Sequence, residues 1–235
     1  SGSECIIKQI VECLSKDNKQ WVIPHPTFEL TDFYCQHYRC KVEKPLYVYK
    51  DHFSIDLEHI LNAHQKILYI VSPHNPTGVT LSLEAINNLC KKYKYVILDQ
   101  AYMLPDEPIH NINHKNLILI RSFSKMGLIT GLRFGVGMCF NNKLFLKFNQ
   151  IRPMYLNSFT LKCIEYIISN DIPLKIKNKI DEEIAKFEPD VKANIVAQAG
   201  NFVLFNSKID TYNQHQLKQY TFNKKIFFRM TVFES

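Results

Sequence analysis

The sequence has no apolar run long enough to span a bilayer, and its N-terminus lacks the charged-then-apolar layout of a secretory signal. It also has no internal repeats and no low-complexity tracts, which excludes a repeat architecture. Hydrophobic residues make up 46% and charged residues 22% of the 235 residues, an ordinary balance for a globular protein. We therefore expect a cytoplasmic protein with one substantial core and no membrane partner.

A disulfide framework is also missing. The seven cysteines are an odd number and are scattered among apolar neighbours, a pattern typical of reduced thiols. Cys35, His37 and Cys40 resemble half of a metal site, but no second half follows at a suitable spacing. We expect no bound metal.

The net charge of +7 is not gathered into a basic block. The lysines within 91–94 lie at the end of a predicted helix, where cations offset the helix dipole, and those within 175–179 alternate with apolar residues. No nucleic-acid recognition motif accompanies the charge, so we expect no nucleic-acid partner. We instead expect the positive charge to attract anionic small molecules.

Helix and strand patterns alternate along the chain. Continuous apolar runs are typical of strands buried on both faces, and such strands separated by helices indicate a mostly parallel sheet. The fold class predicted is α/β, with helices on both faces of a central sheet, in a large domain over 1–172 and a small α+β C-terminal subdomain over 173–235. The pattern predicts strands at 21–23, 67–71, 95–98, 117–120, 134–139, 201–205 and 227–232, and helices at 5–14, 31–39, 83–93, 142–150, 158–169 and 174–187.

Polar residues follow three consecutive predicted strands. In a parallel sheet, ligands bind at the carboxyl ends of the strands, so these residues are expected to converge on one site. The three segments are Ser72-Pro-His-Asn-Pro-Thr-Gly78, then Asp99-Gln-Ala-Tyr102, and then Arg121-Ser-Phe-Ser-Lys125 with Gly131-Leu-Arg-Phe-Gly135.

A site for pyridoxal phosphate (PLP) needs this set of side chains. A lysine must form a Schiff base with the cofactor aldehyde, and a carboxylate must keep the pyridine nitrogen protonated. Neutral donors must hold the ring hydroxyl, and hydroxyls with a guanidinium must hold the phosphate. The residues predicted for these roles are Lys125 for the imine, Asp99 for the ring nitrogen, Asn75 and Tyr102 for the ring hydroxyl, and Ser122, Ser124 and Arg133 for the phosphate; Lys125, Asp99 and Tyr102 are the predicted catalytic residues.

The four motifs at 72–78, 99–102, 122–125 and 131–135 resemble the signature blocks of fold-type I, class I/II aminotransferases. Within that group the chain most resembles the histidinol-phosphate aminotransferase branch. Pro26-Thr-Phe28, the segment 151–158 and the two late strands 201–204 and 229–232 also resemble that branch. The resemblance implies that Phe28 stacks on the pyridine ring and that Arg229, together with Asn75, binds the substrate. It further implies that the backbone amides of Gly2, Ser3 and Glu4 bind the phosphate at a helix N-terminus.

The chain departs from the family pattern at its ends. It begins almost on the first phosphate-binding turn, has Phe233 where a glycine is expected, and lacks the usual final helix. Either the sequence is a portion of a longer chain or the enzyme is a pared-down variant. In the family the preceding arm supplies a lid and a tyrosine that reaches the partner subunit's phosphate. An alternative origin for Ser1-Gly2-Ser3 is an expression tag.

The resemblance favours a PLP-dependent aminotransferase that moves an amino group from a small-molecule donor to a 2-oxo acid. Histidinol phosphate and 2-oxoglutarate are the favoured pair. A threonine-phosphate decarboxylase, which shares every cofactor residue named, is a second hypothesis. A truncated, catalytically silent relative that binds PLP or a partner is a third. The resemblance also implies a homodimer, and the Asn75–Pro76 peptide is a candidate for the cis form.

Overall fold

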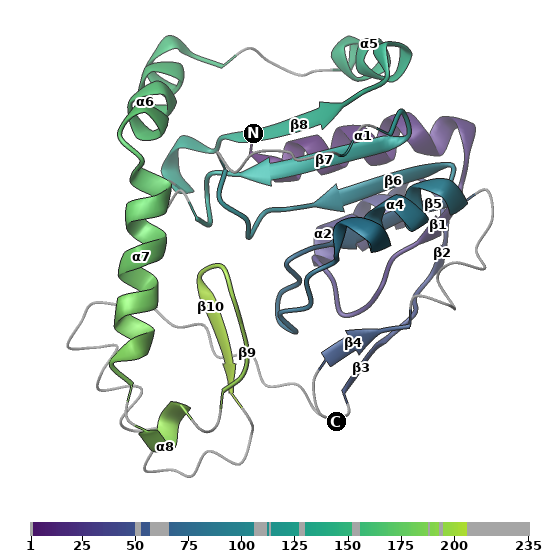
Figure 1. Cartoon of the computed structure of the whole chain (residues 1–235). Coiled ribbons are helices and arrows are strands. Elements are labelled where there is room, and N and C mark those ends of the chain that lie inside the picture. Colours follow the sequence, from purple (N-terminus) through teal and green to yellow (C-terminus); the bar gives the residue numbers. More distant parts are fainter. Residues whose placement is uncertain are drawn as a thin grey trace.

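The centre of the structure, a computed structural model, is a six-stranded sheet with the strand order β2-β1-β5-β6-β7-β8 (Figure 1). The structure describes residues 2–49, 53–56, 66–105, 112, 114–126, 130–151, 156–187, 189–192 and 195–205. Neighbouring strands run parallel except for β8, which pairs antiparallel with β7. The strands are β1 (Gln20–Val22), β2 (Lys41–Glu43), β5 (Ile67–Val71), β6 (Tyr95–Asp99), β7 (Leu117–Ser122) and β8 (Gly135–Cys139).

Helices cover both faces of this sheet, as the sequence predicts. The helices α1 (Ser3–Asp17) and α2 (Glu29–His37) pack on one face, and α4 (Leu83–Lys92) packs on the other. In Figure 1, α4 lies in front of the sheet and α1 behind it. Alternate residues of β5 face opposite sides: Tyr69 belongs to the core under α1, whereas Leu68 belongs to the core under α4. Burial on both faces explains why the central strands are continuous apolar runs.

Three helices begin at side chains that cap them. The Ser82 hydroxyl accepts a hydrogen bond from Ala85 N at the start of α4. The side chains of Asn141 and Asn157 accept bonds from backbone amides in the first turns of α5 (Asn142–Gln150) and α6 (Ser158–Ser169). Such caps satisfy backbone donors that have no partner within the helix.

Further elements extend the molecule beyond the sheet. They are β3 (Tyr47–Tyr49) with β4 (Phe53–Ile55), the short 3₁₀ turn η1 (Thr130–Leu132), α7 (Ile172–Ala185), α8 (Pro189–Lys192), and the antiparallel hairpin of β9 (Ile195–Ala199) and β10 (Phe202–Phe205). The predicted domain boundary at 172/173 falls at the start of α7. The predicted strand at 227–232 lies outside the described residues.

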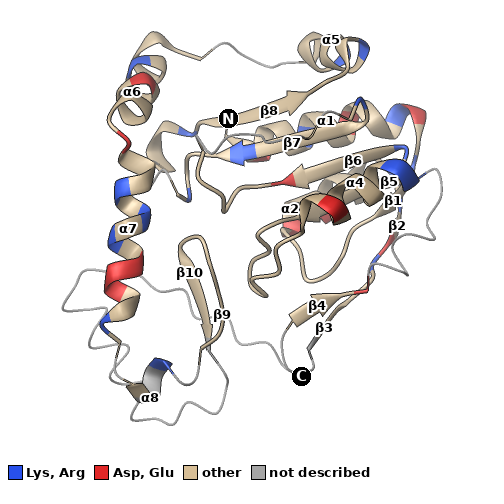
Figure 2. Ribbon diagram, viewed as in Figure 1, with Lys and Arg blue, Asp and Glu red and all other residues tan. Residues whose placement is uncertain are grey.

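Among the residues that the structure describes, no helix combines the length and apolar character needed to cross a membrane. Figure 2 shows lysine and arginine distributed over α1, α4, α5, α6 and α7 rather than gathered on one element.

Candidate functional site

The three predicted polar segments meet at one edge of the sheet. Strands β5, β6 and β7 are adjacent and parallel, so the residues that follow them leave the sheet on the same side. Ser72 N donates a hydrogen bond to Asp99 O, and Gln100 N donates to Ile120 O, which ties the three strand ends together. The predicted convergence is therefore correct at the level of the backbone.

Asp99 is the buried acid of this edge, with 4% of its surface exposed. Its Oδ2 accepts a 2.6 Å hydrogen bond from the Tyr69 hydroxyl, and its Oδ1 accepts a 2.9 Å bond from Ala101 N. Burial raises the pKa of the carboxyl, while the two hydrogen bonds and the positive charge of Lys125 lower it. Lys125 therefore lies close enough for its charge to act on Asp99.

Lys125, Tyr102 and Asn75 complete the cluster around Asp99. Lys125 Nζ lies 5.6 Å from the centre of the Tyr102 ring. The Tyr102 hydroxyl accepts a 2.7 Å hydrogen bond from Asn75 Nδ2, and the Asn75–Pro76 peptide is cis, as predicted. Burial is the main cause that raises the pKa of Tyr102. The structure thus brings together the amide, the phenol, the acid and the amine of the predicted site.

A second group of predicted residues lies at the N-terminus of α1. Gly2 caps this helix with φ +76°, and Ser3 and Glu4 form its first turn. A Cβ added at Gly135 would lie 2.5 Å from Ser3 N, so β8 approaches the helix start too closely for any side chain there. Gly135 pairs with Ser122 across β7 and β8, which places the predicted hydroxyl segment beside the start of α1.

Arg133 reaches the same helix start. Its guanidinium lies 3.3 Å from Glu4 Oε2 in a half-exposed ion pair. Its backbone φ of +50° is uncommon for a residue other than glycine, and such conformations cluster at functional sites. On the hydroxyl segment, Ser124 N donates a hydrogen bond to Ser122 Oγ. A helix N-terminus beside a guanidinium and hydroxyls is a suitable environment for a dianion.

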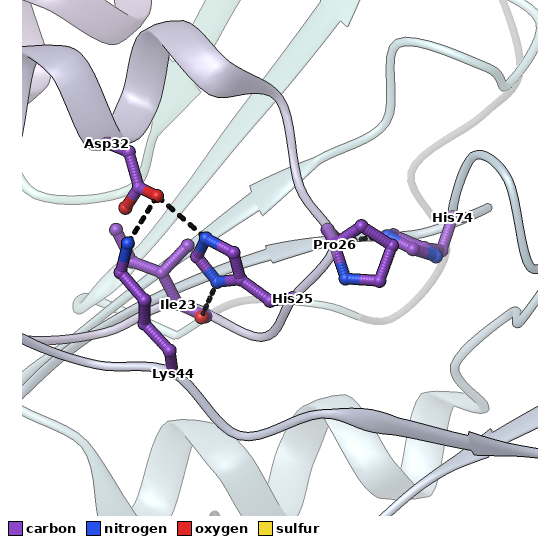
Figure 3. A network of polar contacts seen from close by, with 6 residues as sticks. All are labelled: Ile23, His25, Pro26, Asp32, Lys44 and His74. Carbon is purple, nitrogen blue, oxygen red and sulfur yellow. Dashed lines mark hydrogen bonds and ion pairs between the residues drawn. The ribbon is translucent and has the colours of Figure 1, made fainter. Parts of the chain in front are cut away.

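A network of polar contacts, which the sequence does not reveal, holds the Pro26-Thr27-Phe28 segment. His74 Nε2 lies 2.7 Å from Pro26 O, and His74 Nδ1 lies 2.7 Å from Thr77 Oγ1. Figure 3 shows Pro26 lying between His74 on one side and His25 on the other. The ring of Tyr47 stacks on His74 with their centroids 3.9 Å apart.

On the His25 side, Figure 3 shows Asp32 as the centre of the network. Asp32 Oδ2 lies 2.7 Å from both His25 Nε2 and Lys44 Nζ, and His25 Nδ1 lies 2.8 Å from Ile23 O. Asp32 belongs to α2, so these contacts fix the chain just before Phe28 to the helix just after it. The Phe28 side chain itself is 45% exposed at the start of α2.

Three further residues contact the site, although sequence patterns do not assign them this role. Tyr69 is hidden within an apolar strand run, which signals burial but not a hydroxyl partner. Gly200 lies in the turn of the β9–β10 hairpin, where an added Cβ would lie 2.8 Å from Tyr102 O. Phe202 packs edge-on against the Tyr102 ring at 5.2 Å. The predicted substrate residue Arg229 and residues 152–155 of the segment 151–158 lie outside the described residues.

Gln100 has a packing role. Its Oε1 accepts a 3.2 Å hydrogen bond from Nε of the buried Arg121, so it links the ends of β6 and β7. Within the described ranges, no group of three or more His, Cys, Asp or Glu side chains is placed to hold a metal ion.

Comparison with known proteins identifies the family. Residues 1–205 match the model of the aminotransferase class I and II family, and the chain belongs to that family. The fold accordingly is that of fold-type I aminotransferases, and the likeness to the histidinol-phosphate branch is supported by individual relatives.

Histidinol-phosphate aminotransferase of Pyrococcus furiosus is 30% identical over 211 residues, covering 83% of this chain and 61% of the relative. Histidinol-phosphate aminotransferase 2 of Archaeoglobus fulgidus is 30% identical over 141 residues, covering 59% of this chain and 40% of the relative. The chain therefore spans only about half of the length of such relatives.

Among solved structures, histidinol-phosphate aminotransferase from Sinorhizobium meliloti in complex with pyridoxal-5'-phosphate superposes with a TM-score of 0.74 and 21% identity. The likeness covers 96% of this chain and 65% of that one. At this identity the superposition establishes the fold alone.

Proposed function

We propose that the protein is a PLP-dependent aminotransferase in which Lys125 is the amine that binds the cofactor covalently. The observation that carries this proposal is the meeting of Asp99, Lys125, Tyr102 and Asn75 at the ends of three adjacent strands. Family membership and the histidinol-phosphate aminotransferases among its relatives support it.

The donor set fits PLP. When bound, the cofactor supplies an aldehyde that captures amines and a protonated pyridine ring that withdraws electrons from the substrate. In this chain Asp99 would stay ionised and hold the proton of the ring nitrogen, while Asn75 and Tyr102 would hold the ring hydroxyl. Phe28 would stack on the ring.

The phosphate would bind at the N-terminus of α1, through the backbone amides of Gly2, Ser3 and Glu4, the hydroxyls of Ser122 and Ser124, and the Arg133 guanidinium. Gly2 is buried, and the family match begins at residue 1, which supports this role over an expression tag. The ion pair between Arg133 and Glu4 must loosen, or rearrange, to admit a dianion.

Lys125 would perform the proton transfer of the reaction. As a free amine, Lys125 Nζ would accept the substrate α-proton and later return it. Arg229 is proposed to bind the substrate α-carboxylate, assisted by Asn75.

Removing the Lys125 amine tests the proposal directly. We expect Lys125→Ala to lose the visible absorbance that covalent PLP gives, and to lose turnover by several orders of magnitude, because the amine proposed to bind the cofactor is removed. Absorbance spectra of the protein with PLP would measure this. Lys115→Ala, which removes an exposed lysine, is the matched control and should behave as the unmodified protein. A persisting absorbance band in Lys125→Ala contradicts the assignment.

Histidinol phosphate is the proposed amino donor, with 2-oxoglutarate as acceptor, on the strength of the relatives. Incubation with histidinol phosphate and 2-oxoglutarate should release glutamate. Release of CO₂ from threonine phosphate instead would identify the decarboxylase alternative, which uses the same cofactor residues. Binding of PLP without either product would indicate a catalytically silent relative.

We also propose that the protein acts as a homodimer in the cytoplasm, as expected from its family. Sedimentation at micromolar protein concentration should give a species of twice the chain mass. A monomer under these conditions contradicts the proposal.

A further inference from the structure

Tyr69 places a hydroxyl group in the largely apolar core under α1. The residue lies in the middle of β5, is only 1% exposed, and shares the core under α1 with Ile67 and Val71 of the same strand. Its hydroxyl donates the 2.6 Å hydrogen bond to Asp99 Oδ2. A buried hydroxyl is costly unless it is paired, so this bond is a specific feature of the strand rather than a consequence of hydrophobic packing.

The direction of this hydrogen bond is fixed. Burial and the neighbouring carboxylate raise the pKa of Tyr69 well above its usual value, so the phenol keeps its proton. The Thr31 hydroxyl of α2 lies near enough to lower that pKa, but not in hydrogen-bonding geometry. Tyr69 is therefore a permanent donor, and Asp99 is the acceptor.

The carboxylate depends on this donor because it is buried. Desolvation raises the pKa of Asp99 and favours its neutral form, which could not balance a protonated ring nitrogen. Three groups, one from each neighbouring element, lower the pKa of Asp99: the Tyr69 hydroxyl on β5, the Ala101 amide after β6 and the Lys125 charge after β7. Once Lys125 is used for chemistry its charge changes, whereas the two hydrogen bonds persist.

We propose that Tyr69 is a positioning residue for the cofactor, holding Asp99 ionised and oriented so that the acid can keep the pyridine nitrogen protonated. The inference rests on the proposed function. Tyr69 touches neither substrate nor cofactor in this role, because it acts through Asp99. The two hydrogen bonds occupy one lone pair on each carboxylate oxygen and leave the others for the ring.

The test compares Tyr69→Phe with Tyr93→Phe. Both variants remove one hydroxyl from a buried tyrosine, but Tyr93 belongs to the core on the opposite face of the sheet. Titration with PLP should show that Tyr69→Phe binds it roughly tenfold more weakly, since a hydrogen bond to a charged group is lost. The control should match the unmodified protein.

The absorbance of bound PLP as a function of pH gives a second readout that does not depend on turnover. Without the Tyr69 donor, Asp99 would be more basic and would draw the proton of the ring nitrogen further toward itself, so the ring would carry less positive charge and withdraw fewer electrons. The proton on the Lys125 nitrogen is then held more tightly. The midpoint of the absorbance titration should rise by on the order of one pH unit in Tyr69→Phe.

A double-mutant cycle with Asp99→Asn separates this role from a general structural effect. If Tyr69 acts through the carboxylate, Tyr69→Phe should weaken PLP binding far less in the D99N background than alone. The double variant also removes both partners of the buried bond, which keeps a foldable protein available should the single variant prove unstable.

The outcomes are distinguishable. Failure of the unmodified protein to bind PLP covalently would remove the proposed function itself. Normal covalent binding in the unmodified protein, with an unchanged titration midpoint in Tyr69→Phe or an equal loss of affinity in both backgrounds of the cycle, would overturn the role of Tyr69 alone.

Discussion

His74 is the residue that joins the cis-proline turn after β5 to the segment that bears Phe28. Because the Pro26 carbonyl can only accept, His74 Nε2 must carry the proton, and Nδ1 of the neutral ring accepts from the Thr77 hydroxyl. Burial lowers the pKa of His74 to about 4. The neutral ring is therefore part of the folded structure.

This neutral histidine predicts a loss of stability in mild acid. Its pKa is lower in the folded than in the unfolded chain, so the unfolded chain binds more protons between pH 6.5 and 4 and stability falls as pH falls through that window. The contribution of His74 should decrease by about 2 kcal/mol between pH 7 and pH 5. Urea unfolding at the two pH values would measure it.

Replacing His74 with Asn should remove most of this pH dependence, although it lowers stability at pH 7. His37→Asn, at an exposed position, should leave the pH dependence intact. An equal pH slope in the unmodified protein and His74→Asn would show that His74 is not the group responsible.

The residues of the candidate PLP site could be predicted from the sequence because they follow strands whose order could be inferred. Asp99, Asn75, Tyr102 and Lys125 each stand directly after an apolar run or within a few residues of one. Tyr69 was not predictable, because a buried strand position reveals nothing about where its hydroxyl points. The roles of His74 and Asp32 were missed because their side-chain contacts depend on how the turns around them fold, and no local sequence pattern encodes these contacts.

At the scale of elements, β8 packs closely against the start of α1 in the candidate phosphate site. We predict that Gly135→Ala weakens both folding and PLP binding. Its Cβ would lie 2.5 Å from Ser3 N and 2.9 Å from Gly2 C, so the helix start must move. Overpacking of this kind costs about 1–3 kcal/mol.

Gly131→Ala is the matched control for this prediction, because an added Cβ there meets no atom within 4 Å. Thermal unfolding and PLP titration of the two variants would compare them. If Gly135→Ala binds PLP as well as Gly131→Ala does, the phosphate does not bind at the N-terminus of α1.

The long helices were predicted closely, whereas of the three-residue strands that the structure describes only β1 was predicted, at 21–23. The bounds of α5 and α6 agree with the predicted 142–150 and 158–169, because amphipathic periodicity and asparagine caps mark them. The strands β2, β3 and β4 have three residues each, too few for a periodic pattern to emerge. Their conformation is set by pairing with distant partners, which local sequence does not encode.

At the scale of the whole molecule, the β9–β10 hairpin brings the late part of the chain onto the candidate site. An added Cβ at Gly78, in the turn after β5, would lie 3.0 Å from Ala197 Cβ in β9, and Phe202 of β10 contacts the Tyr102 ring. The hairpin therefore covers residues that follow both β5 and β6. The contacts join segments about 100 residues apart, and their placement depends on the complete fold rather than on local pattern.

Gly200 is the point at which this contact can be tested. Its φ of +53° is left-handed, and an added Cβ would lie 2.8 Å from Tyr102 O and 3.1 Å from Tyr102 Cβ. Gly200→Ala thus combines backbone strain with a backbone collision, and should destabilise the protein by about 2 kcal/mol or more. Because the hairpin must then withdraw from Tyr102, PLP binding should weaken as well.

Gln198→Ala, at an exposed position of β9, should change neither thermal unfolding nor PLP affinity. Destabilisation without any loss of PLP affinity in Gly200→Ala would mean that the hairpin stabilises the fold but does not position the phenol.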